Sequence, residues 1–388
     1  MKRYMGVKKR LLSIANKIIP KSNIVLFSSY PAFSDNSLAL FHYIVNNRKD
    51  IIECYRLYWG QSNNDKVPEI VKENVDVTVV EKGSFKGIWT FLRAKYIFST
   101  HGYFSEVYSG AGQSQVNLWH GNGYKSITDK DRMYRGDLTI VTGDIYRKIH
   151  SRVLDMDENR VITTGLPRND WLFSKEKALE KLGVSKESYK KIYIWMPTYR
   201  KASIGHSGVD GNATAFGIST MNAEQFRKLE DVLLNNNCLL IIKPHPMDSM
   251  LLAGLGKYEH IRVITNIDLE NNDIQLYELL PETDGLLSDY SSVVVDYLLL
   301  GKPITMVLSD MDEYRKSRGF VFDLVEDYFP GPIVSDFDSL LNYFQEADTI
   351  DNQWLSKRLK LKKVFHKYDD ACSSERVCNL IFDANCLK

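Results

Sequence analysis

The chain has 388 residues, of which 44% are hydrophobic, so it is long and apolar enough to form two domains with packed cores. Its 50 basic and 49 acidic residues leave a net charge of +1, which argues against nucleic acid or another partner recognised by overall charge. The five cysteines are odd in number and none are at C-x-x-C spacing, which argues against a disulfide framework or zinc site and favours a reducing, cytoplasmic compartment. No apolar run approaches the ~20 residues of a membrane span, and the N-terminus lacks a signal-peptide core.

The first predicted element is an amphipathic helix over residues 4–19. Its apolar face carries four residues: Val7, Leu11, Ile14 and Ile18. Residues 1–21 contain seven basic and no acidic residues. Such a helix can lie in the interface of an anionic membrane. Alternatively, it can pack on the first domain with its basic side in water.

Strands and helices then alternate, which predicts parallel sheets with crossover helices. Seven strands are expected in the first half: Asn23–Ser29, Glu53–Tyr58, Asp76–Val80, Lys95–Ser99, Gln115–Trp119, Leu138–Thr142 and Arg160–Thr164. Five are expected in the second half: Lys191–Met196, Cys238–Lys243, Ile261–Thr265, Gly285–Leu287 and Pro303–Val307. Helical patterns lie between and after them: Asn36–Asn46, Ser84–Arg93, Ala223–Asn235, Ile274–Leu280, Ser291–Leu300, Gln353–Phe365 and Ser373–Phe382.

This twofold alternation predicts an α/β fold of two Rossmann-like domains facing a cleft. We expect an N-terminal domain over residues 1–172 and a C-terminal domain over residues 173–388, with a polar connector near 168–190. The tail helices of the second domain should pack back toward the first. Residues 201–220 are rich in Gly, Ser and Thr and predict a surface loop. Ligands of such sheets bind beyond the carboxyl ends of the strands.

Two common nucleotide-binding motifs are absent from the sequence. The first strand is followed by Ser29-Tyr-Pro-Ala-Phe-Ser-Asp-Asn36 and not by G-x-G-x-x-G, which argues against a nicotinamide-dependent dehydrogenase. The sequence also lacks G-x-x-x-x-G-K-[ST], which argues against a P-loop kinase or ATPase.

Two histidines follow predicted strands. His120, in Leu118-Trp-His-Gly-Asn-Gly-Tyr-Lys125, has glycine neighbours that let the backbone approach a ligand, and the ordinary pKa of histidine, near 6.5, suits a general base. His245 lies between Pro244 and Pro246, which fix its backbone, and Lys243 lies two residues before it. His120 could instead be a histidine hydrogen-bonded in a loop, and the Pro-His-Pro segment could be a strand exit marked by prolines.

Small polar and basic residues follow other predicted strands. Ser288-Asp-Tyr-Ser-Ser292 lies between a strand and a buried helix, where backbone N–H groups and hydroxyls can bind an anion such as a diphosphate. Thr198, Arg200 and Lys201 can bind phosphate at the root of the loop, Arg200 in bidentate fashion. Ser34-Asp-Asn36 begins the first long helix, and helix capping explains it as well as a functional role does.

At these residues the chain resembles the CDP-glycerol glycerophosphotransferase family of teichoic-acid and capsule synthesis. Nine segments match in the family's order and cover nearly the whole chain: Phe33-Ser-Asp-Asn36, Trp119-His-Gly121, Gly165-Leu-Pro-Arg-Asn-Asp170, Met196-Pro-Thr-Tyr-Arg200, Lys243-Pro-His-Pro246, Ser288-Asp-Tyr-Ser-Ser292, Gly301-Lys-Pro-Ile304, Pro330-Gly-Pro-Ile333 and Asp370-Ala-Cys-Ser-Ser-Glu-Arg376. The sequence departs from the family at Asn122-Gly-Tyr, where relatives often have Thr-Pro-Leu, and at Asp370-Ala-Cys, where Asp-Gly-Lys is commoner.

The resemblance implies a GT-B-like enzyme, with the acceptor on the first domain and the CDP donor on the second. It implies transfer of glycerol phosphate from CDP-glycerol to a hydroxyl of a lipid-linked or polymeric acceptor, with release of CMP. The expected catalytic residues are His120, as the base, and His245. The donor site is expected to include nine residues: Thr198, Arg200, Lys243, Ser288, Asp289, Ser291, Ser292, Ser374 and Arg376. The acceptor side is expected to include five: Ser34, Asp35, Asn36, Gly121 and Asn122.

Three alternatives remain open from the sequence. The donor could be CDP-ribitol, the protein could be a GT-B glycosyltransferase that uses a nucleotide sugar, or it could bind a sugar nucleotide without catalysis. No cofactor is expected and a metal is not favoured, because Asp310 and Asp312 resemble a helix start. A lipid-linked acceptor implies a cytoplasmic enzyme, peripheral on the inner face of the cell membrane, with an anionic membrane surface as a partner and no nucleic acid.

Overall fold

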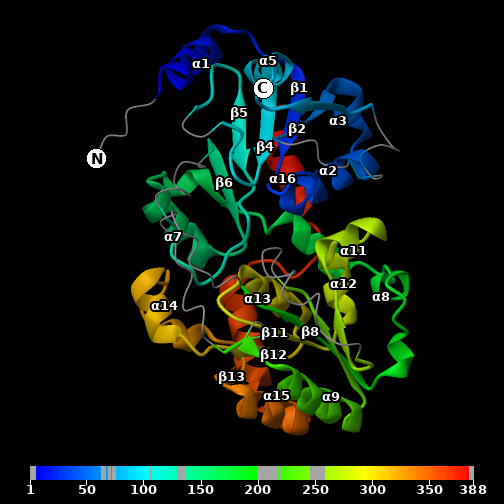
Figure 1. The fold of residues 1–388 in the computed structure, drawn as a ribbon. Coiled ribbons are helices and arrows are strands. Elements are labelled where there is room, and N and C mark those ends of the chain that lie inside the picture. Colours follow the sequence, from blue (N-terminus) through cyan, green and yellow to red (C-terminus); the bar gives the residue numbers. More distant parts are fainter. Residues whose placement is uncertain are drawn as a thin grey trace. The chain divides into compact units, whose positions relative to one another are not determined.

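A computed structural model describes residues 6–62, 67–68, 71, 76–104, 107–128, 136–198, 216–217, 220–244 and 258–383. The chain forms two compact units (Figure 1). Unit 1 comprises Met1–Asn122, Ile127–Trp171 and Phe365–Lys388. Unit 2 comprises Gly123–Ser126 and Leu172–Val364. The last part of the chain lies in unit 1, and a four-residue segment of the first half lies in unit 2.

Unit 1 contains a parallel sheet in the order β3-β2-β1-β4-β5-β6-β7. Its strands are β1 (Ser22–Ser28), β2 (Arg56–Gln61), β3 (Thr78–Glu81), β4 (Ala94–Ser99), β5 (Ser114–Asn117), β6 (Leu138–Val141) and β7 (Val161–Thr163). Its helices are α1 (Val7–Ile18), α2 (Asp35–Asn47), α3 (Lys49–Cys54), α5 (Phe85–Arg93), α7 (Asp144–Leu154) and α16 (Ser373–Ile381), with the 3₁₀ segments η1 (Glu158–Arg160) and η2 (Pro167–Phe173). Each of the seven predicted strands overlaps an observed one.

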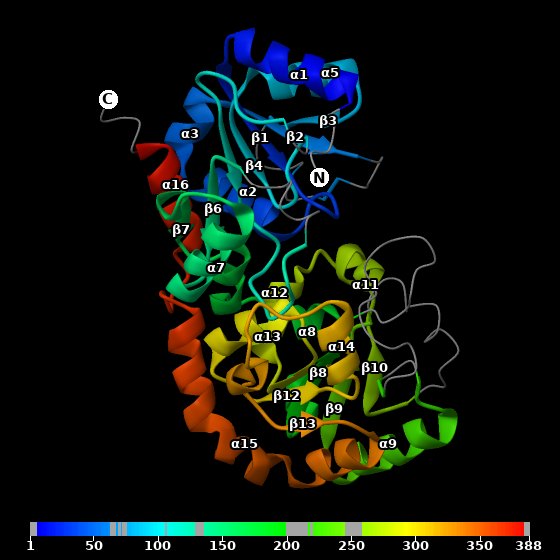
Figure 2. The same cartoon turned by 90° about the vertical axis from the view of Figure 1, so that its left-hand side faces the viewer.

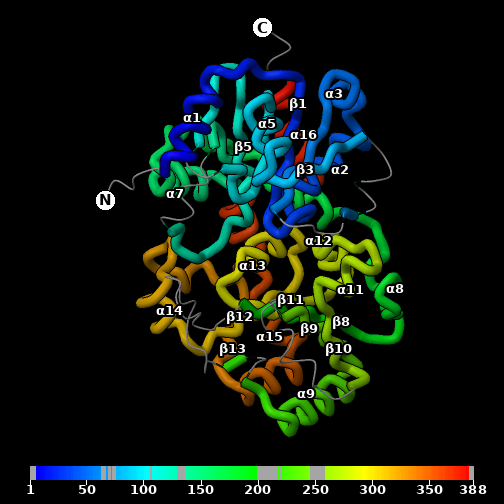
Figure 3. Tube along the Cα trace, turned by 45° about the horizontal axis from the view of Figure 1, so that its top comes forward, coloured from blue at the N-terminus to red at the C-terminus, as the bar shows by residue number. Residues whose placement is uncertain are grey.

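Helices cover both faces of this sheet because successive side chains of a strand point to opposite faces. Leu26 of β1 joins a core cluster with Phe91 of α5. The next residue, Phe27, makes an edge-to-face contact with Phe41 of α2, with ring centroids 5.5 Å apart. On that second face α16 also packs, through Phe382 at its end. Figure 3 shows α16, in red, among the blue and cyan elements of unit 1.

Helix α1 packs on unit 1 through a different face from the predicted apolar one. Leu12, Ala15 and Ile19 contact the core cluster under α5. Asn16 is fully buried and donates to Gln113 Oε1 at 2.8 Å. The predicted apolar face remains in solvent, with exposed fractions of 74%, 61%, 56% and 73% for four residues: Val7, Leu11, Ile14 and Ile18. Figure 2 shows α1 beside α5.

Unit 2 contains a second parallel sheet in the order β10-β9-β8-β11-β12-β13. Its strands are β8 (Lys191–Met196), β9 (Cys238–Ile242), β10 (Ile261–Val263), β11 (Gly285–Ser288), β12 (Ile304–Val307) and β13 (Ile333–Val334). Its helices are α8 (Ala178–Lys181), α9 (Ala223–Asn235), α11 (Asn266–Asn271), α12 (Leu276–Leu279), α13 (Ser292–Tyr297), α14 (Met311–Ser317) and α15 (Phe337–Phe365). Its 3₁₀ segments are η3 (Lys186–Ser188), η5 (Leu280–Glu282), η6 (Leu298–Leu300) and η7 (Val325–Tyr328). The predicted α/β, GT-B-like fold class is confirmed by these two sheets.

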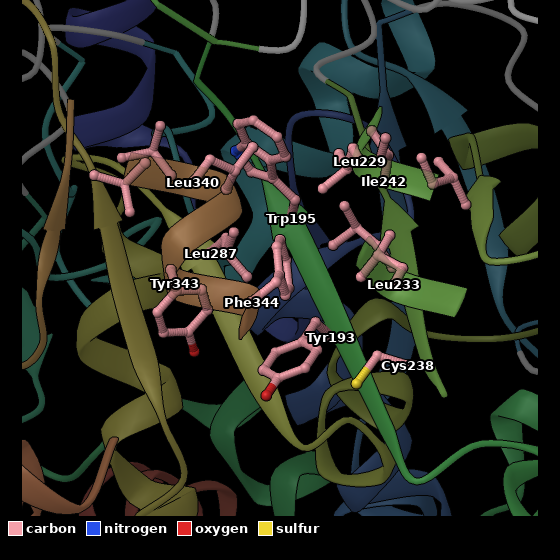
Figure 4. Close-up of a cluster of buried hydrophobic side chains, with 14 of the residues drawn as sticks. Tyr193, Trp195, Leu229, Leu233, Cys238, Ile242, Leu287, Leu340, Tyr343 and Phe344 are labelled. Carbon is pink, nitrogen blue, oxygen red and sulfur yellow. The ribbon is translucent and has the colours of Figure 1, made fainter. Parts of the chain in front are cut away.

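The core of unit 2 lies between its sheet and helices α9 and α15 (Figure 4). Tyr193 and Trp195 of β8 point to this face, as the alternation of side chains along a strand requires. They meet Leu229 and Leu233 of α9, and Phe344 of α15 packs edge-to-face on Tyr193. Strand β13 was not predicted, because two residues are too few to show a pattern, and only the second half of α15 was predicted.

Candidate active site

The loop that carries His120 is held by buried hydrogen bonds in unit 1. After β5 the chain turns at Trp119, whose φ of 56° lies in the left-handed region that few non-glycine residues adopt. The side-chain amide of Asn36, which is fully buried, donates to the carbonyls of Leu118 and Trp119 at 3.1 and 3.0 Å. The Trp119 N–H donates to Asn117 Oδ1 at 2.9 Å. These hydrogen bonds hold the strained turn in place, so the backbone of His120 is fixed.

A buried ion pair supports the same loop. Arg168 of η2 donates from Nη1 to Asp35 Oδ1 at 2.8 Å and to the carbonyl of His120 at 3.1 Å. Its backbone N–H donates to Asn36 Oδ1 at 3.0 Å. Sequence reasoning did not select Arg168, although it lies inside the matched segment Gly165–Asp170. Its place in a matched segment could therefore have pointed to Arg168, but the partner of Arg168, Asp35, is 133 residues away in the chain.

Three histidines lie near Trp119: His120 and His150 contact its ring, and His101 stacks on His120. The His120 and His101 ring centroids are 4.4 Å apart at an interplanar angle of 20°. His150 of α7 meets the Trp119 ring edge-on at 4.5 Å. Burial, and to a smaller extent the charge of His120, lowers the pKa of His150 to about 3. His101 and His150 were not predicted site residues, because only the strand order brings them to His120.

Several residues predicted to face the acceptor use their side chains inside the protein. Asn122 is buried; its Oδ1 accepts from the Thr142 N–H at 2.9 Å and its Nδ2 lies 3.1 Å from His150 Nε2. Ser34 Oγ donates to the carbonyl of Pro31 at 2.7 Å. With Asn36 and Asp35, these residues shape the His120 loop. Gly121 has a φ of 126°, where any side chain would be strained.

In unit 2, polar residues follow three neighbouring strands. Asp289 is buried, and its Oδ2 accepts from the Thr198 N–H at 2.9 Å and from Thr198 Oγ1 at 2.6 Å. Ser288 Oγ donates to the carbonyl of Met196 at 2.6 Å. Asp289 thus fixes the turns after β8 and β11.

A cation lies near these turns at the end of β9. Lys243 is 9% exposed and donates from Nζ to Asn266 Oδ1 at 2.8 Å. Burial lowers the pKa of Lys243 to about 8. A desolvated ammonium group gains from a nearby anion, because the anion stabilises its charged form. Lys243 is therefore suited to binding phosphate.

The predicted anion turn begins α13. Ser291 is the N-cap residue, in extended conformation, and its hydroxyl makes no capping hydrogen bond, so capping alone does not account for this serine. Ser292 is the first residue of the helix. Gly123, which belongs to unit 2, approaches this turn so closely that a Cβ would lie 3.0 Å from the Cα of Ser292. No larger residue fits there without a shift.

Ser374 and Arg376, predicted for the donor site, lie in unit 1, whereas the other described residues predicted for that site lie in unit 2. The Ser373 and Ser374 N–H groups both donate to the carboxylate of Asp170 at 2.8 Å, which holds the start of α16. Arg376 pairs with Asp370 at 2.7 Å and donates to the carbonyl of Thr164. These contacts are structural, and a role toward the donor stays a prediction.

Three predicted residues, Arg200, Lys201 and His245, lie outside the described residues, as does most of the loop predicted over 201–220. Within the described part of the chain, no three His, Cys, Asp or Glu side chains are grouped as a metal ion would require. Asp310 is the N-cap residue of α14, as its sequence suggested.

The family model of CDP-glycerol:poly(glycerophosphate) glycerophosphotransferases matches residues 11–383. The chain belongs to this family. Membership supports a CDP-alditol phosphotransferase of teichoic-acid synthesis. It does not decide whether the alditol is glycerol or ribitol.

Several members of the glycerophosphotransferase family and its solved structures are similar to this chain. The teichoic acid glycerol-phosphate transferase of Staphylococcus aureus is 24% identical over 94% of this chain and 94% of its own length. The teichoic acid ribitol-phosphate primase of Bacillus spizizenii is 28% identical over 63% of this chain and 59% of its own length. A solved structure of the wall teichoic acid polymerase TagF has a TM-score of 0.76 at 22% identity, covering 97% of this chain and 93% of that one. At 22% identity, the similarity to the TagF structure shows the fold alone.

Proposed function

We propose that the protein transfers glycerol phosphate from CDP-glycerol to a hydroxyl of a lipid-linked or polymeric acceptor in teichoic acid or capsule synthesis, and releases CMP. The family match over residues 11–383 carries the proposal, because its motif residues occupy the carboxyl ends of strands in both sheets. Relatives that use ribitol phosphate make CDP-ribitol the second candidate donor.

The proposed reaction begins with the acceptor hydroxyl. His120 takes the hydroxyl proton while the oxygen attacks the phosphorus that bears glycerol. A new P–O bond forms, the P–O bond to the cytidylyl phosphate breaks, and CMP leaves with that electron pair. CMP is a stable leaving group, because a phosphate's second pKa is about 6. The protonated histidine then loses its proton to solvent.

In this proposal the donor's diphosphate lies against the polar cluster of unit 2. Lys243 supplies positive charge, and the turn at Ser291 and Ser292 supplies hydroxyls and N–H groups. Asp289 keeps the turn in place through Thr198. Arg200 and His245 stay predictions for the same role.

The experiment that tests the function compares donors. The purified protein is incubated with CDP-glycerol, CDP-ribitol or a UDP-sugar and a lipid-linked acceptor, and released nucleotide is measured. We expect CMP release with CDP-glycerol at a kcat/KM at least tenfold above that with CDP-ribitol. The reverse preference would assign a ribitolphosphotransferase, and release of UDP from the UDP-sugar alone would assign a glycosyltransferase.

A second part of the proposal concerns the cell membrane, where a lipid-linked acceptor lies. No helix of the described residues is long and apolar enough to span a bilayer. Helix α1 instead exposes an apolar face next to basic residues, which suits an anionic membrane interface. Phe85 and Trp89 of the neighbouring α5 are also exposed, at 84% and 46%. The Lys21 ammonium is turned inward onto Asn16 and the carbonyl of Leu92, so it is not available to lipid.

Membrane binding should depend on the exposed face of α1. Because Asn16 and Lys21 tie the helix into unit 1, point changes are a cleaner test than deletion of residues 1–21. We expect Leu11→Gln/Ile14→Gln to lower the fraction that sediments with phosphatidylglycerol-containing liposomes by at least fivefold, and high salt to lower it for the wild type. Ile267→Gln/Leu324→Gln in unit 2 changes two equally exposed residues as the control. Equal binding by all three proteins would contradict this part.

A further inference from the structure

His101 forms a stacked pair with His120 in unit 1. The ring centroids are 4.4 Å apart and the planes differ by 20°. Both side chains are partly exposed, so solvent protons reach them. The mechanism above uses His120 and gives His101 no role.

The sheet explains why the two rings meet. β4 and β5 are neighbouring parallel strands with Ser99 opposite Asn117, so the chain leaves both strands at the same edge. His101 follows β4 by two residues and His120 follows β5 by three. The buried Thr100 lies with Oγ1 at 2.9 Å from His101 Nδ1, and its N–H donates to the carbonyl of Ser28. These contacts of Thr100 fix the position of the His101 ring independently of its contact with His120.

We propose that His101 is a positioning residue for His120: it fixes the plane of the His120 ring by stacking, and it takes up the first proton of the pair so that His120 remains a neutral base. The inference rests on the proposed function, in which His120 accepts the proton of the acceptor hydroxyl. Stacked rings keep a defined offset, which limits rotation of the base away from the hydroxyl.

The second part of the role proposed for His101 depends on the charge of the histidine pair. Two imidazolium groups this close repel, so the pair takes up its protons in two separate steps. When the pair carries a single proton, His120 remains neutral in the fraction of molecules in which that proton is on His101. That fraction keeps the enzyme active at a pH at which a lone histidine would already be protonated.

Further ionisable groups among the described residues lie near His120. His150 of α7 stays neutral down to about pH 3 because burial lowers its pKa. Arg168 of η2 reaches the His120 carbonyl but is paired with Asp35 of α2 at 2.8 Å. The buried His150 therefore keeps its charge state between pH 5 and 8. Among these described neighbours, His101 is the one to which we assign the effect on the titration of His120.

The test separates stacking from charge. His101→Phe keeps an aromatic ring and removes the titrating group, whereas His101→Ala removes both. We follow the Hε1 resonance of His120 by NMR against pH, assigned by its loss in His120→Gln, and we measure kcat/KM against pH. In both variants the midpoint of His120 should rise by about one pH unit, because no neighbour takes the first proton. The plateau kcat/KM should fall about tenfold in His101→Ala and stay within about threefold in His101→Phe.

Control variants keep the inference falsifiable. His42→Phe removes a histidine elsewhere in unit 1, on α2, and should leave the His120 midpoint unchanged. His101→Gln replaces His101→Phe if the latter does not fold. A His120 midpoint within ~0.2 pH units of the wild type in both His101 variants overturns the role of His101, whatever the turnover. A shifted midpoint in a protein that releases no CMP from any CDP-alditol instead overturns the proposed function and leaves the coupled pair intact.

Discussion

Replacing His120 with alanine is expected to lower kcat for CMP release by about 10²- to 10⁴-fold, which is the usual contribution of a general base. The affinity for CDP should stay within about twofold, because the polar cluster assigned to the diphosphate lies in unit 2 and His120 lies in unit 1. Turnover under saturating donor and acceptor, together with calorimetric titration of CDP, measures both effects on one purified variant.

Two observations would decide against this role. A folded His120→Ala protein with near-normal turnover would remove the base from the mechanism and leave substrate positioning to explain the rate. A loss of both CDP affinity and folded structure would make His120 a structural loop residue. His42→Ala is the matched control, since it deletes a partly buried histidine from the same unit and should leave kcat unchanged.

His150 is expected to make unit 1 unstable in mild acid. The Oδ1 of Asn122 accepts from the Thr142 N–H, so its Nδ2 faces His150 Nε2 and donates to a nitrogen that must be unprotonated. Burial accordingly lowers the pKa of His150 to about 3 in the folded protein. Above pH 6.5 neither state binds a proton at His150; below it the unfolded chain does and the folded chain does not. Stability present above pH 6.5 is therefore lost as the pH falls toward 3, by about 1.4 kcal/mol per pH unit.

Urea unfolding between pH 7 and 5 measures this effect. His150→Gln keeps an acceptor for Asn122 and cannot titrate, so its free energy of unfolding should fall by about 2 kcal/mol less than that of the wild type over this range. The comparison stops at pH 5 because carboxylates begin to titrate below it. His42→Gln serves as the control. Equal slopes for the wild type and His150→Gln would mean that His150 titrates alike in the folded and unfolded states.

Most of the fold was predictable from local patterns. Each expected strand overlaps an observed one, because apolar runs bounded by turn residues report a buried parallel strand directly. The candidate base His120 was found in the same way, from its place after a strand and its glycine neighbours. What the pattern could not provide is the order of strands in space. β1, β4 and β5 are neighbours in the sheet although 65 residues of chain separate β1 from β4, and that order brings Asn36 and His101 to the His120 loop.

The roles of individual polar residues were the hardest to predict. Asn36 and Asn122 are short polar residues beside the His120 motif, and such residues suit a ligand and an internal hydrogen bond equally well. The structure shows them turned inward. Arg168 illustrates the opposite error, since it lay in a matched segment and was passed over. Its contact with the His120 loop depends on a partner on α2 that no local pattern reveals.

The way in which the chain is shared between the two units has a consequence for biosynthesis. Gly123–Ser126 leaves the ribosome before any other part of unit 2, and Tyr124 in it is fully buried against Phe322 and Phe329. The helix α16, whose end covers the face of the unit 1 sheet through Phe382, emerges only after unit 2 has been made. Domains usually fold in the order of their synthesis. Here neither unit can complete its core early, and a nascent chain stalled near residue 365 would expose the sheet face that α16 covers. Such a chain should depend on chaperones more than one with two consecutive domains.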